Sequence, residues 1–244
     1  MSNDEFLAPN PHALEAMGWQ DSKKIKNDWQ AWRWFTPIFL HGHLEHLAGN
    51  VVIQLVLGVG IEYGIGFAKM SILYLLSGVG GNLLSACIAP AQYGVGASTA
   101  VFGLVGFLAS YSCSNFSYMG KQRPGQRWFL IVLTSALVLL NLNQGPNADT
   151  HVDNWGHLGG FISGILIGLA ITEWFDYAAR KAEPERTPDR FADEDYKNRG
   201  CCCRSWCWNW CGWMLTTIWF VTLLVIFYAF TDTDNLDQGA IDGP

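Results

Sequence analysis

The sequence predicts an all-α fold, a polytopic membrane helix bundle with six transmembrane helices, and two observations support this prediction. Only 15% of the 244 residues are charged, whereas a soluble domain carries about 25%. Between Lys69 and Lys121, moreover, 51 consecutive residues include no Asp, Glu, Lys or Arg. As a helix this run would extend roughly 75 Å, enough to cross a hydrocarbon core of about 30 Å twice. The composition therefore excludes a soluble enzyme of the ordinary kind.

Six apolar segments follow a polar N-terminal stretch, and each is expected to be helical because backbone groups in lipid must pair within their own segment. The segments are 44–61, 70–89, 98–111, 128–140, 155–171 and 213–230. Several are shorter than the ~20 residues of an ordinary span, which a bundle tolerates by thinning the bilayer around it. Lys and Arg gather in 112–127 and 177–204, so these two loops are expected to face the cytosol.

The charge balance and the cysteines narrow the possible partners. A net charge of −6 leaves no basic surface for nucleic acid. Five of the seven cysteines crowd among tryptophans just before the last apolar segment: Cys201, Cys202, Cys203, Cys207 and Cys211. This pattern is not a disulfide framework, and it favours reversible S-palmitoylation over a zinc site, because no paired CxxC or His partner accompanies it. The alternative is unmodified cysteines in an interfacial helix.

The first candidate catalytic residue is Ser98, which follows a glycine-containing turn and opens the third apolar segment. This position places it at or near a helix N-terminus, where unpaired backbone N–H groups and the helix dipole favour a developing anion. The alternative interpretation is a plain serine N-cap, because serine is a preferred capping residue.

The second candidate is His157, at the start of the fifth apolar segment. It shares a helical stripe with Gly160, Gly164 and Gly168, and small residues at such spacing let two helices approach closely. The third segment has a matching row of small residues, namely Thr99, Gly103, Gly106 and Ser110. Packing the two rows together would bring His157 within hydrogen-bonding distance of Ser98, as a general base beside a nucleophile. The alternative is a buried histidine satisfied by a neighbour.

The third candidate group lies in 41–50. His46 and Asn50 are four residues apart on the first apolar helix, so they share a face, and both are neutral donors suited to an oxyanion. His41 and His43 are expected to be loop or helix-start residues rather than catalytic ones. A metal site made of these histidines is disfavoured, because neither HExxH nor its inverted form occurs.

Several motifs occur in one order along the chain. They are WRWFTPIFLHGHLEHLAGN at 32–50, GIEYG at 60–64, YLLSGVGGNLLS at 74–85, GAS at 96–98 and HLGG at 157–160. Together they resemble the rhomboid intramembrane serine proteases, over roughly 11–176.

By that resemblance Ser98 is the nucleophile and His157 the general base of a dyad, without metal or cofactor. His46 and Asn50 are expected to line the oxyanion hole with the Ser98 backbone N–H. The resemblance implies a serine endopeptidase in the lipid bilayer, with single-pass transmembrane proteins as substrates. The alternatives are a catalytically silent rhomboid-like binding or trafficking factor and, least favoured, a transporter or channel, since neither paired intramembrane charges nor inverted repeats occur.

The chain departs from the family pattern at two places. Thr99 stands where the family usually has glycine. The added bulk beside the nucleophile is expected to narrow substrate access or shift the geometry without abolishing activity, because Ser98, His157 and the oxyanion candidates are retained. By the resemblance, the chain begins within what would be the first external loop, which implies either that the family's first transmembrane helix lies upstream of this start or that the chain is a reduced form. The added last helix resembles the six-plus-one arrangement of eukaryotic secretory-pathway rhomboids, which implies a secretory-pathway or plasma membrane location.

The resemblance also implies an order of domains. We expect an external loop region at 1–43 and a catalytic membrane domain at 44–176. A cytosolic charged linker with the Cys/Trp segment is expected at 177–212, an additional C-terminal helix at 213–230 and an acidic tail at 231–244.

Overall fold

The structure is a computed structural model that describes residues 8–116, 124–142, 152–182, 205–234 and 236. Within these ranges every regular element is a helix, apart from an isolated antiparallel β-bridge between Gln20 and Gly94. The all-α membrane fold is thus confirmed.

Six long helices lie at the six predicted segments. They are α3 (Leu44–Ile65), α4 (Phe67–Ile88), α5 (Ser98–Ser114), α7 (Pro124–Leu142), α8 (Asn154–Ala182) and α10 (Ser205–Val225), the last continued by a π-helical turn, η5 (Ile226–Phe230). In the described part of the chain, four stretches are long and apolar enough to cross a membrane: Leu44–Ile65, Phe67–Ile88, Asn154–Thr172 and Asn209–Phe230. The apolar α5 has 17 residues and falls short of that length, so the number of six spans stays a prediction.

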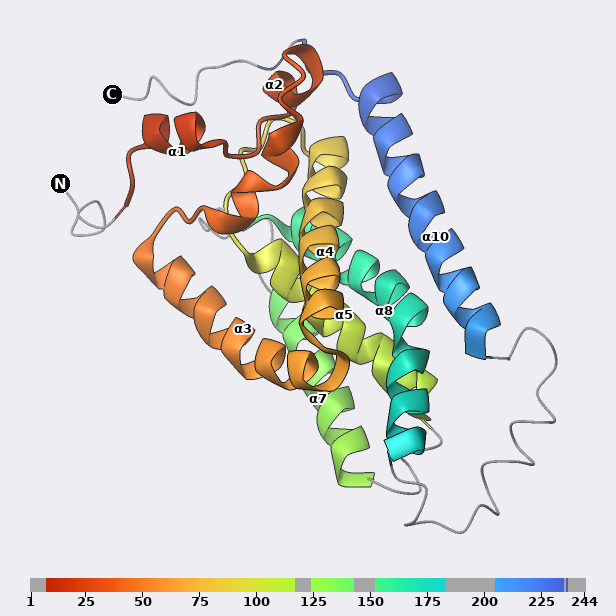
Figure 1. Cartoon of the computed structure of the whole chain (residues 1–244). Helices are drawn as coiled ribbons and strands as arrows, with labels where there is room; N and C mark the ends of the chain where they lie inside the picture. Colours follow the sequence, from red (N-terminus) through yellow and green to blue (C-terminus); the bar gives the residue numbers. More distant parts are fainter. Residues whose placement is uncertain (1–7, 117–123, 143–151, 183–204, 235, 237–244) are drawn as a thin grey trace.

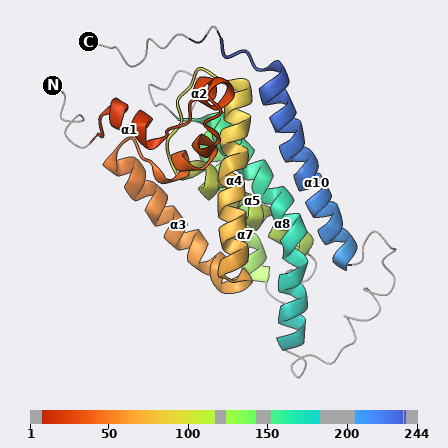
Figure 2. The same ribbon diagram turned by 45° about the horizontal axis from the view of Figure 1, so that its top comes forward.

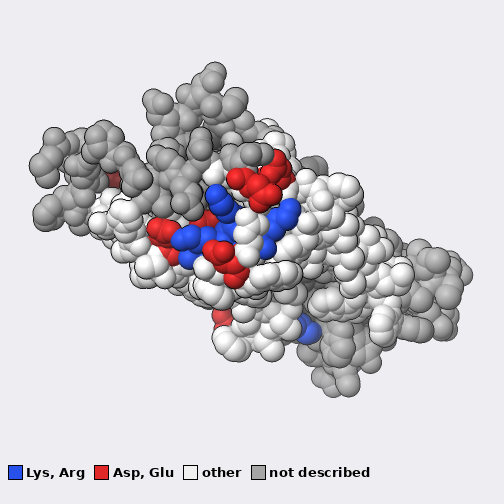
Figure 3. Space-filling model, turned by 90° about the horizontal axis from the view of Figure 1, so that it is seen from above, with Lys and Arg blue, Asp and Glu red and all other residues white. Residues whose placement is uncertain are grey.

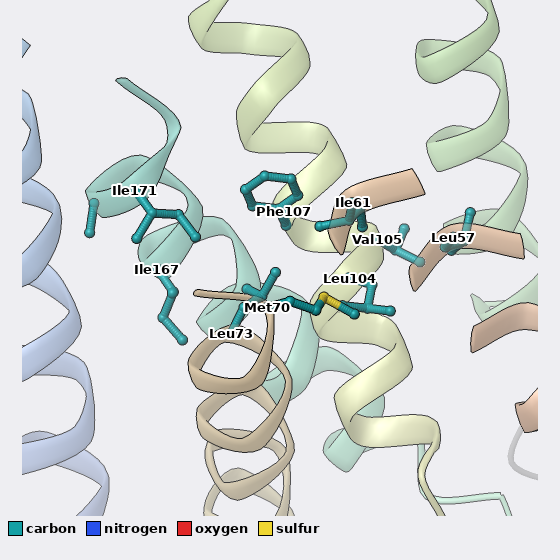
Figure 4. Packing of buried hydrophobic residues seen from close by; sticks show 10 residues of the cluster. Leu57, Ile61, Met70, Leu73, Leu104, Val105, Phe107, Ile167 and Ile171 are labelled. Atoms are coloured by element: carbon teal, nitrogen blue, oxygen red, sulfur yellow. The ribbon is translucent and has the colours of Figure 1, made fainter. Parts of the chain in front are cut away.

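α5 lies at the centre of the bundle, and α3, α4, α7 and α8 pack around it (Figures 1 and 2). One buried cluster joins four of these helices, as Figure 4 shows: Leu57 and Ile61 from α3, Met70 and Leu73 from α4, Leu104, Val105 and Phe107 from α5, and Ile167 and Ile171 from α8. α10 packs along α8 on the opposite side of the bundle from α3 (Figure 1).

The contact between α5 and α8 is especially close because glycines line it on both sides. A methyl group on Gly160 would overlap the Thr99 carbonyl oxygen, and one on Gly164 would overlap that of Gly103. Such small-residue seams let two backbones approach, which strengthens van der Waals packing where lipid supplies no hydrophobic driving force. The predicted pairing of the two rows of small residues is confirmed.

Residues 8–43, called here the N-terminal cap, are folded rather than a plain loop. They contain two short α-helices, α1 (Pro11–Met17) and α2 (Ser22–Asn27), and two 3₁₀ turns, η2 (Ala31–Trp34) and η3 (Thr36–Phe39). Buried Arg33 holds the cap together, because its guanidinium donates to the carbonyl oxygens of Glu15 and Trp19 at 3.0 Å each. The external loop region predicted at 1–43 therefore holds helices that the sequence pattern did not reveal.

The cap covers one end of the bundle, and the polar surface gathers there. Seen from this end, most of the charged side chains in view lie together, while isolated ones lie apart near the edge and most of the other visible described surface carries none (Figure 3). An ion pair between Lys24 and Glu15 joins α2 to α1 in this region. A face with charges next to uncharged flanks is typical of a bundle whose sides contact lipid and whose end contacts water.

The cysteine cluster lies mostly outside the described residues. Cys201, Cys202 and Cys203 lie outside the described residues, and so does the side chain of Cys207. Cys211, near the start of α10, is a free and exposed thiol. S-palmitoylation of this cluster stays a prediction.

Candidate active site

Ser98 is the first residue of α5, and the loop before it brings its hydroxyl to the cap end of the bundle. Gly96 has φ +135°, a backbone conformation that side-chain-bearing residues rarely adopt, and this turn lets α5 begin two residues later. Ala97, not Ser98, occupies the N-cap position, and no side-chain hydrogen bond caps the helix. The half-buried Ser98 side chain therefore does not act as a cap, which removes the plain structural interpretation of this serine.

The N-terminal cap holds the 89–97 loop in place. The Gly96 N–H donates to the Pro37 carbonyl oxygen at 2.9 Å, and the Ala97 N–H donates to Nε2 of His41 at 3.4 Å. Further back, Gln20 pairs with Gly94 through their backbones. His41 thus contacts the residue directly before Ser98, a role that its prediction as a loop or helix-start residue did not include.

His157 lies in the first turn of α8 and is 8% exposed. Its imidazole stacks on the ring of Phe102, with ring centroids 4.4 Å apart and an interplanar angle of 16°. Phe102 follows Ser98 by four residues and so shares its face of α5. Since helical side chains lean toward the helix N-terminus, this stack brings His157 to the face and end of α5 that carry Ser98. Sequence reasoning missed Phe102, although its spacing from Ser98 is visible in the sequence.

The start of α8 is fixed by Asp153. Its carboxylate accepts a hydrogen bond from the Gly156 N–H at 2.8 Å, and its carbonyl oxygen accepts one from the His157 N–H at 3.0 Å. Burial raises the pKa of Asp153, and hydrogen bonds from the Gly156 N–H, the Ser85 side chain and the Trp155 N–H oppose that shift. The carboxylate acts on the helix backbone, as an N-cap does.

The side chains of His46 and Ser98 both lie close to Gly96. A methyl group on Gly96 would lie 3.0 Å from His46 Nε2 and 3.6 Å from Ser98 Oγ. Asn50 lies one turn further along α3, is 6% exposed, and donates from its amide to the His46 carbonyl oxygen at 3.0 Å. His43, in contrast, is the exposed N-cap of α3 and makes no capping bond with its side chain. The structure therefore brings the side chains of His46 and Ser98 close to the same glycine, with Asn50 one turn further along α3.

The side chain of Thr99 is buried beside glycines of α4 and α8. It is 4% exposed, and methyl groups on Gly81 and Gly156 would lie 2.7 Å from its Cβ and 3.0 Å from its Cγ2, respectively. Its bulk therefore lies in the junction of α4, α5 and α8. The effect of this bulk on substrate access or site geometry stays a prediction.

Glu62, near the end of α3, is exposed, while Arg33 is buried in the cap as described above. Across the ranges that the structure describes, no three His, Cys, Asp or Glu side chains converge as ligands for a metal ion.

Comparison with known proteins bears on this arrangement. A family model described as a Rhomboid domain matches residues 28–174, more than half of the chain. The chain belongs to the rhomboid family. The match covers α3 to α7 and the first part of α8, and it contains Ser98, His157, His46 and Asn50.

Several relatives of this rhomboid are similar over most of the chain. RHOMBOID-like protein 1 of Arabidopsis thaliana is 35% identical over 169 residues, which cover 69% of this chain and 42% of that protein. Rhomboid-like protease 5 of Toxoplasma gondii is 34% identical over 165 residues, 68% of this chain and 19% of its own length. RHOMBOID-like protein 6, mitochondrial, of Arabidopsis thaliana is 32% identical over 172 residues, 70% of this chain and 53% of that protein. The chain thus spans about half, or less, of the length of these relatives.

Family membership and the apolar helices together make this rhomboid an integral membrane protein. The names of its relatives include both proteases and a mitochondrial protein, so they do not assign one membrane.

Proposed function

We propose that this rhomboid is an intramembrane serine endopeptidase that cleaves transmembrane protein substrates in or near the membrane with a dyad of Ser98 and His157. The observation that supports this most strongly is the stack of His157 on Phe102, one helical turn from Ser98. A histidine used only for packing would need no such register with a serine at a helix N-terminus. Two Toxoplasma gondii relatives, named Rhomboid-like protease 5 and Rhomboid-like protease 3, support the same reaction.

In the proposed reaction, Ser98 Oγ attacks the scissile carbonyl carbon while His157 accepts its proton. The tetrahedral intermediate then collapses, His157 gives the proton to the leaving amine, and an acyl-enzyme remains on Ser98. Water, deprotonated by His157, attacks this ester and releases the second product. In each half of the reaction His157 passes the proton that it has accepted to the leaving group. This group is the amine in the first half and Ser98 Oγ in the second, so the protons balance with water as the only co-reactant.

The negative charge on the intermediate develops at the N-terminus of α5, where backbone N–H groups and the helix dipole favour it. The Ser98 N–H and His46 supply further donors in the proposal, and Asn50 adds its amide. One N–H of that amide already donates to the His46 carbonyl oxygen, and the amide carries a second.

The proposed substrates are single-pass transmembrane proteins whose membrane segment unwinds readily. A regular helix engages its carbonyl groups in internal hydrogen bonds, so a scissile carbonyl becomes accessible only where the helix opens. The C-terminal helix α10 favours a membrane of the secretory pathway or the plasma membrane for this reaction.

The direct test is labelling of the detergent-solubilised full chain with a fluorophosphonate probe. Labelling is expected in the wild type and absent in Ser98→Ala and His157→Ala. Ser114→Ala, at the exposed end of the same helix, is the matched control and is expected to label normally. A folded wild type that does not label would contradict the proposal and favour the catalytically silent alternative.

A further inference from the structure

The end of the last helix docks on the N-terminal cap. Phe227, in the π-helical turn after α10, has no exposed surface and meets the buried Trp34 of the cap edge to face, with ring centroids 4.9 Å apart. Tyr228 stacks on Trp29 with centroids 5.9 Å apart. Figures 1 and 2 show the end of α10 beside α2, although about 200 residues separate them in sequence.

Polar contacts continue this interface beyond the helix. The Lys26 ammonium group donates to the Thr231 carbonyl oxygen, and the Asn27 amide donates to the Asp234 carboxylate at 3.3 Å. Thr233 is buried and donates to the Asn27 side-chain oxygen at 3.5 Å. Residues 231–234 therefore leave the membrane helix and bind along α2.

The cap turns sharply at the same interface. Trp29 has φ +57°, in the left-handed region that a bulky residue rarely adopts. Its backbone there leads from α2 into η2, and its ring lies on Tyr228. A strained conformation persists only where surrounding contacts determine it, and the contact with Tyr228 is one of these.

The part of the cap that contacts Phe227 also contacts the loop before Ser98. Trp34 and Pro37 lie three residues apart in the consecutive turns η2 and η3, and the Pro37 carbonyl oxygen accepts the Gly96 N–H. The other side of Trp34 is tied to the bundle, since its carbonyl oxygen accepts a hydrogen bond from Asn82 of α4 at 2.9 Å. Contacts thus run without a break from the C-terminal helix, through the cap, to the residue two positions before Ser98.

We propose that Phe227 and the 231–234 segment are positioning elements for Ser98: by docking on the cap, they hold the 89–97 loop in the conformation that presents the Ser98 hydroxyl. This rests on the proposed function for its catalytic consequence. It assigns a role to the added C-terminal helix, whose described side chains are not among the site residues named above. Misplacing a reacting group by about 1 Å can cost orders of magnitude in rate, so a loosened cap is expected to slow Ser98 without removing it.

The first test compares rates of fluorophosphonate labelling per folded molecule, at a temperature well below melting. Phe227→Ala is expected to label about tenfold more slowly than wild type, because the loop loses its fixed position. Phe230→Ala is the matched control, since Phe230 belongs to the same turn but is 78% exposed, and it is expected to label normally. Lys26→Met is expected to slow labelling, and Lys26→Arg to restore it.

The second test does not depend on activity. Hydrogen exchange of the Gly96 and Ala97 amides reports whether the cap still holds the loop, because these N–H groups donate to Pro37 and His41. In Phe227→Ala these two amides are expected to exchange faster while the central amides of α5 and α8 stay protected. Unchanged exchange at Gly96 and Ala97 would overturn the proposal, as would a lowered melting temperature with a wild-type labelling rate.

The two tests separate this proposal from the proposed function. A wild type that does not label, with faster exchange at Gly96 in Phe227→Ala, would contradict the protease but support the positioning role. A wild type that labels, with exchange unaffected by Phe227→Ala, would support the protease and overturn the positioning role.

Discussion

The imidazole of His157 lies flat on the ring of Phe102, with centroids 4.4 Å apart. This contact joins α8 to the face of α5 that begins with Ser98, and it restricts the histidine ring to one plane. An aromatic pair of this kind contributes about 0.5–1.5 kcal/mol beyond its buried area. Its larger consequence is orientation, because a general base must reach the proton that it removes.

Replacing Phe102 tests that role. Phe102→Ala is expected to lower the rate of fluorophosphonate labelling about tenfold, because the imidazole loses the surface that orients it. Phe102→Tyr keeps the ring and is expected to label at nearly the wild-type rate. Phe116→Ala, at the exposed far end of the α5 region, serves as the control. Equal labelling rates in Phe102→Ala and wild type would show that the stack does not orient His157.

The glycine seam between α5 and α8 predicts a sharp difference between two Gly→Ala substitutions. Gly160→Ala would place a methyl group into the Thr99 carbonyl oxygen, whereas a methyl group on Gly60 of α3 would meet nothing within 4 Å. Overpacking costs roughly 1–3 kcal/mol, and backbone atoms cannot move aside as a flexible side chain can. Gly60→Ala is expected to be neutral or slightly stabilising, because alanine is the better helix former.

Thermal unfolding of both variants in the same detergent provides the measurement. Gly160→Ala is expected to melt several degrees below wild type and Gly60→Ala at or above it. Similar melting temperatures for the two variants would mean that α8 can shift along α5 at little cost.

The placement of Thr99 predicts that its hydroxyl is dispensable. Thr99 Oγ1 is buried without a hydrogen-bond partner, and a buried hydroxyl in that state lowers stability by roughly 1–3 kcal/mol. Thr99→Val removes the hydroxyl and keeps the shape, so it is expected to raise the melting temperature and leave Ser98 labelling unchanged. Thr99→Gly leaves a cavity and is expected to destabilise the protein. Loss of labelling in Thr99→Val would instead implicate the hydroxyl in the reaction.

The sequence allowed the membrane helices to be predicted because they depend on local composition. An apolar run without charge, such as the one after Lys69, predicts a membrane helix whatever elements surround it. The spacing of Gly160 and Gly164 likewise predicts that their helix packs closely against another. Ser98 and His157 could be selected for the same reason, since each opens an apolar segment.

Features that depend on contacts between distant segments could not be predicted in this way. The two α-helices of the cap have only seven and six residues, too few for a clear periodicity. His41 acquires its role only when the cap meets the 89–97 loop, and Phe227 only when α10 returns to Trp34. Local sequence carries no signal for any of these pairs.

A final prediction concerns pH and His41. Its pKa lies below the ordinary value of 6.5, first because burial disfavours the charged ring and second because His46 lies nearby, with the Phe39 carbonyl group opposing the shift. The folded protein therefore holds His41 neutral, which agrees with Nε2 accepting the Ala97 N–H. On acidification the unfolded chain takes up this proton first. The stabilisation is complete above the unfolded pKa of 6.5 and is lost as the pH falls toward the lower, folded pKa.

The measurement is the melting temperature at several pH values for wild type and His41→Gln. Wild type is expected to lose more stability than the variant between about pH 7.5 and about pH 5.5, because glutamine can accept the Ala97 N–H without titrating. The other histidines are common to both proteins, so the difference between the two curves reports the titration of His41 together with its coupling to His46. Parallel curves would show that the folded protein accepts the proton on His41 as readily as the unfolded chain does. The contact of His41 with the 89–97 loop would then not depend on a neutral ring.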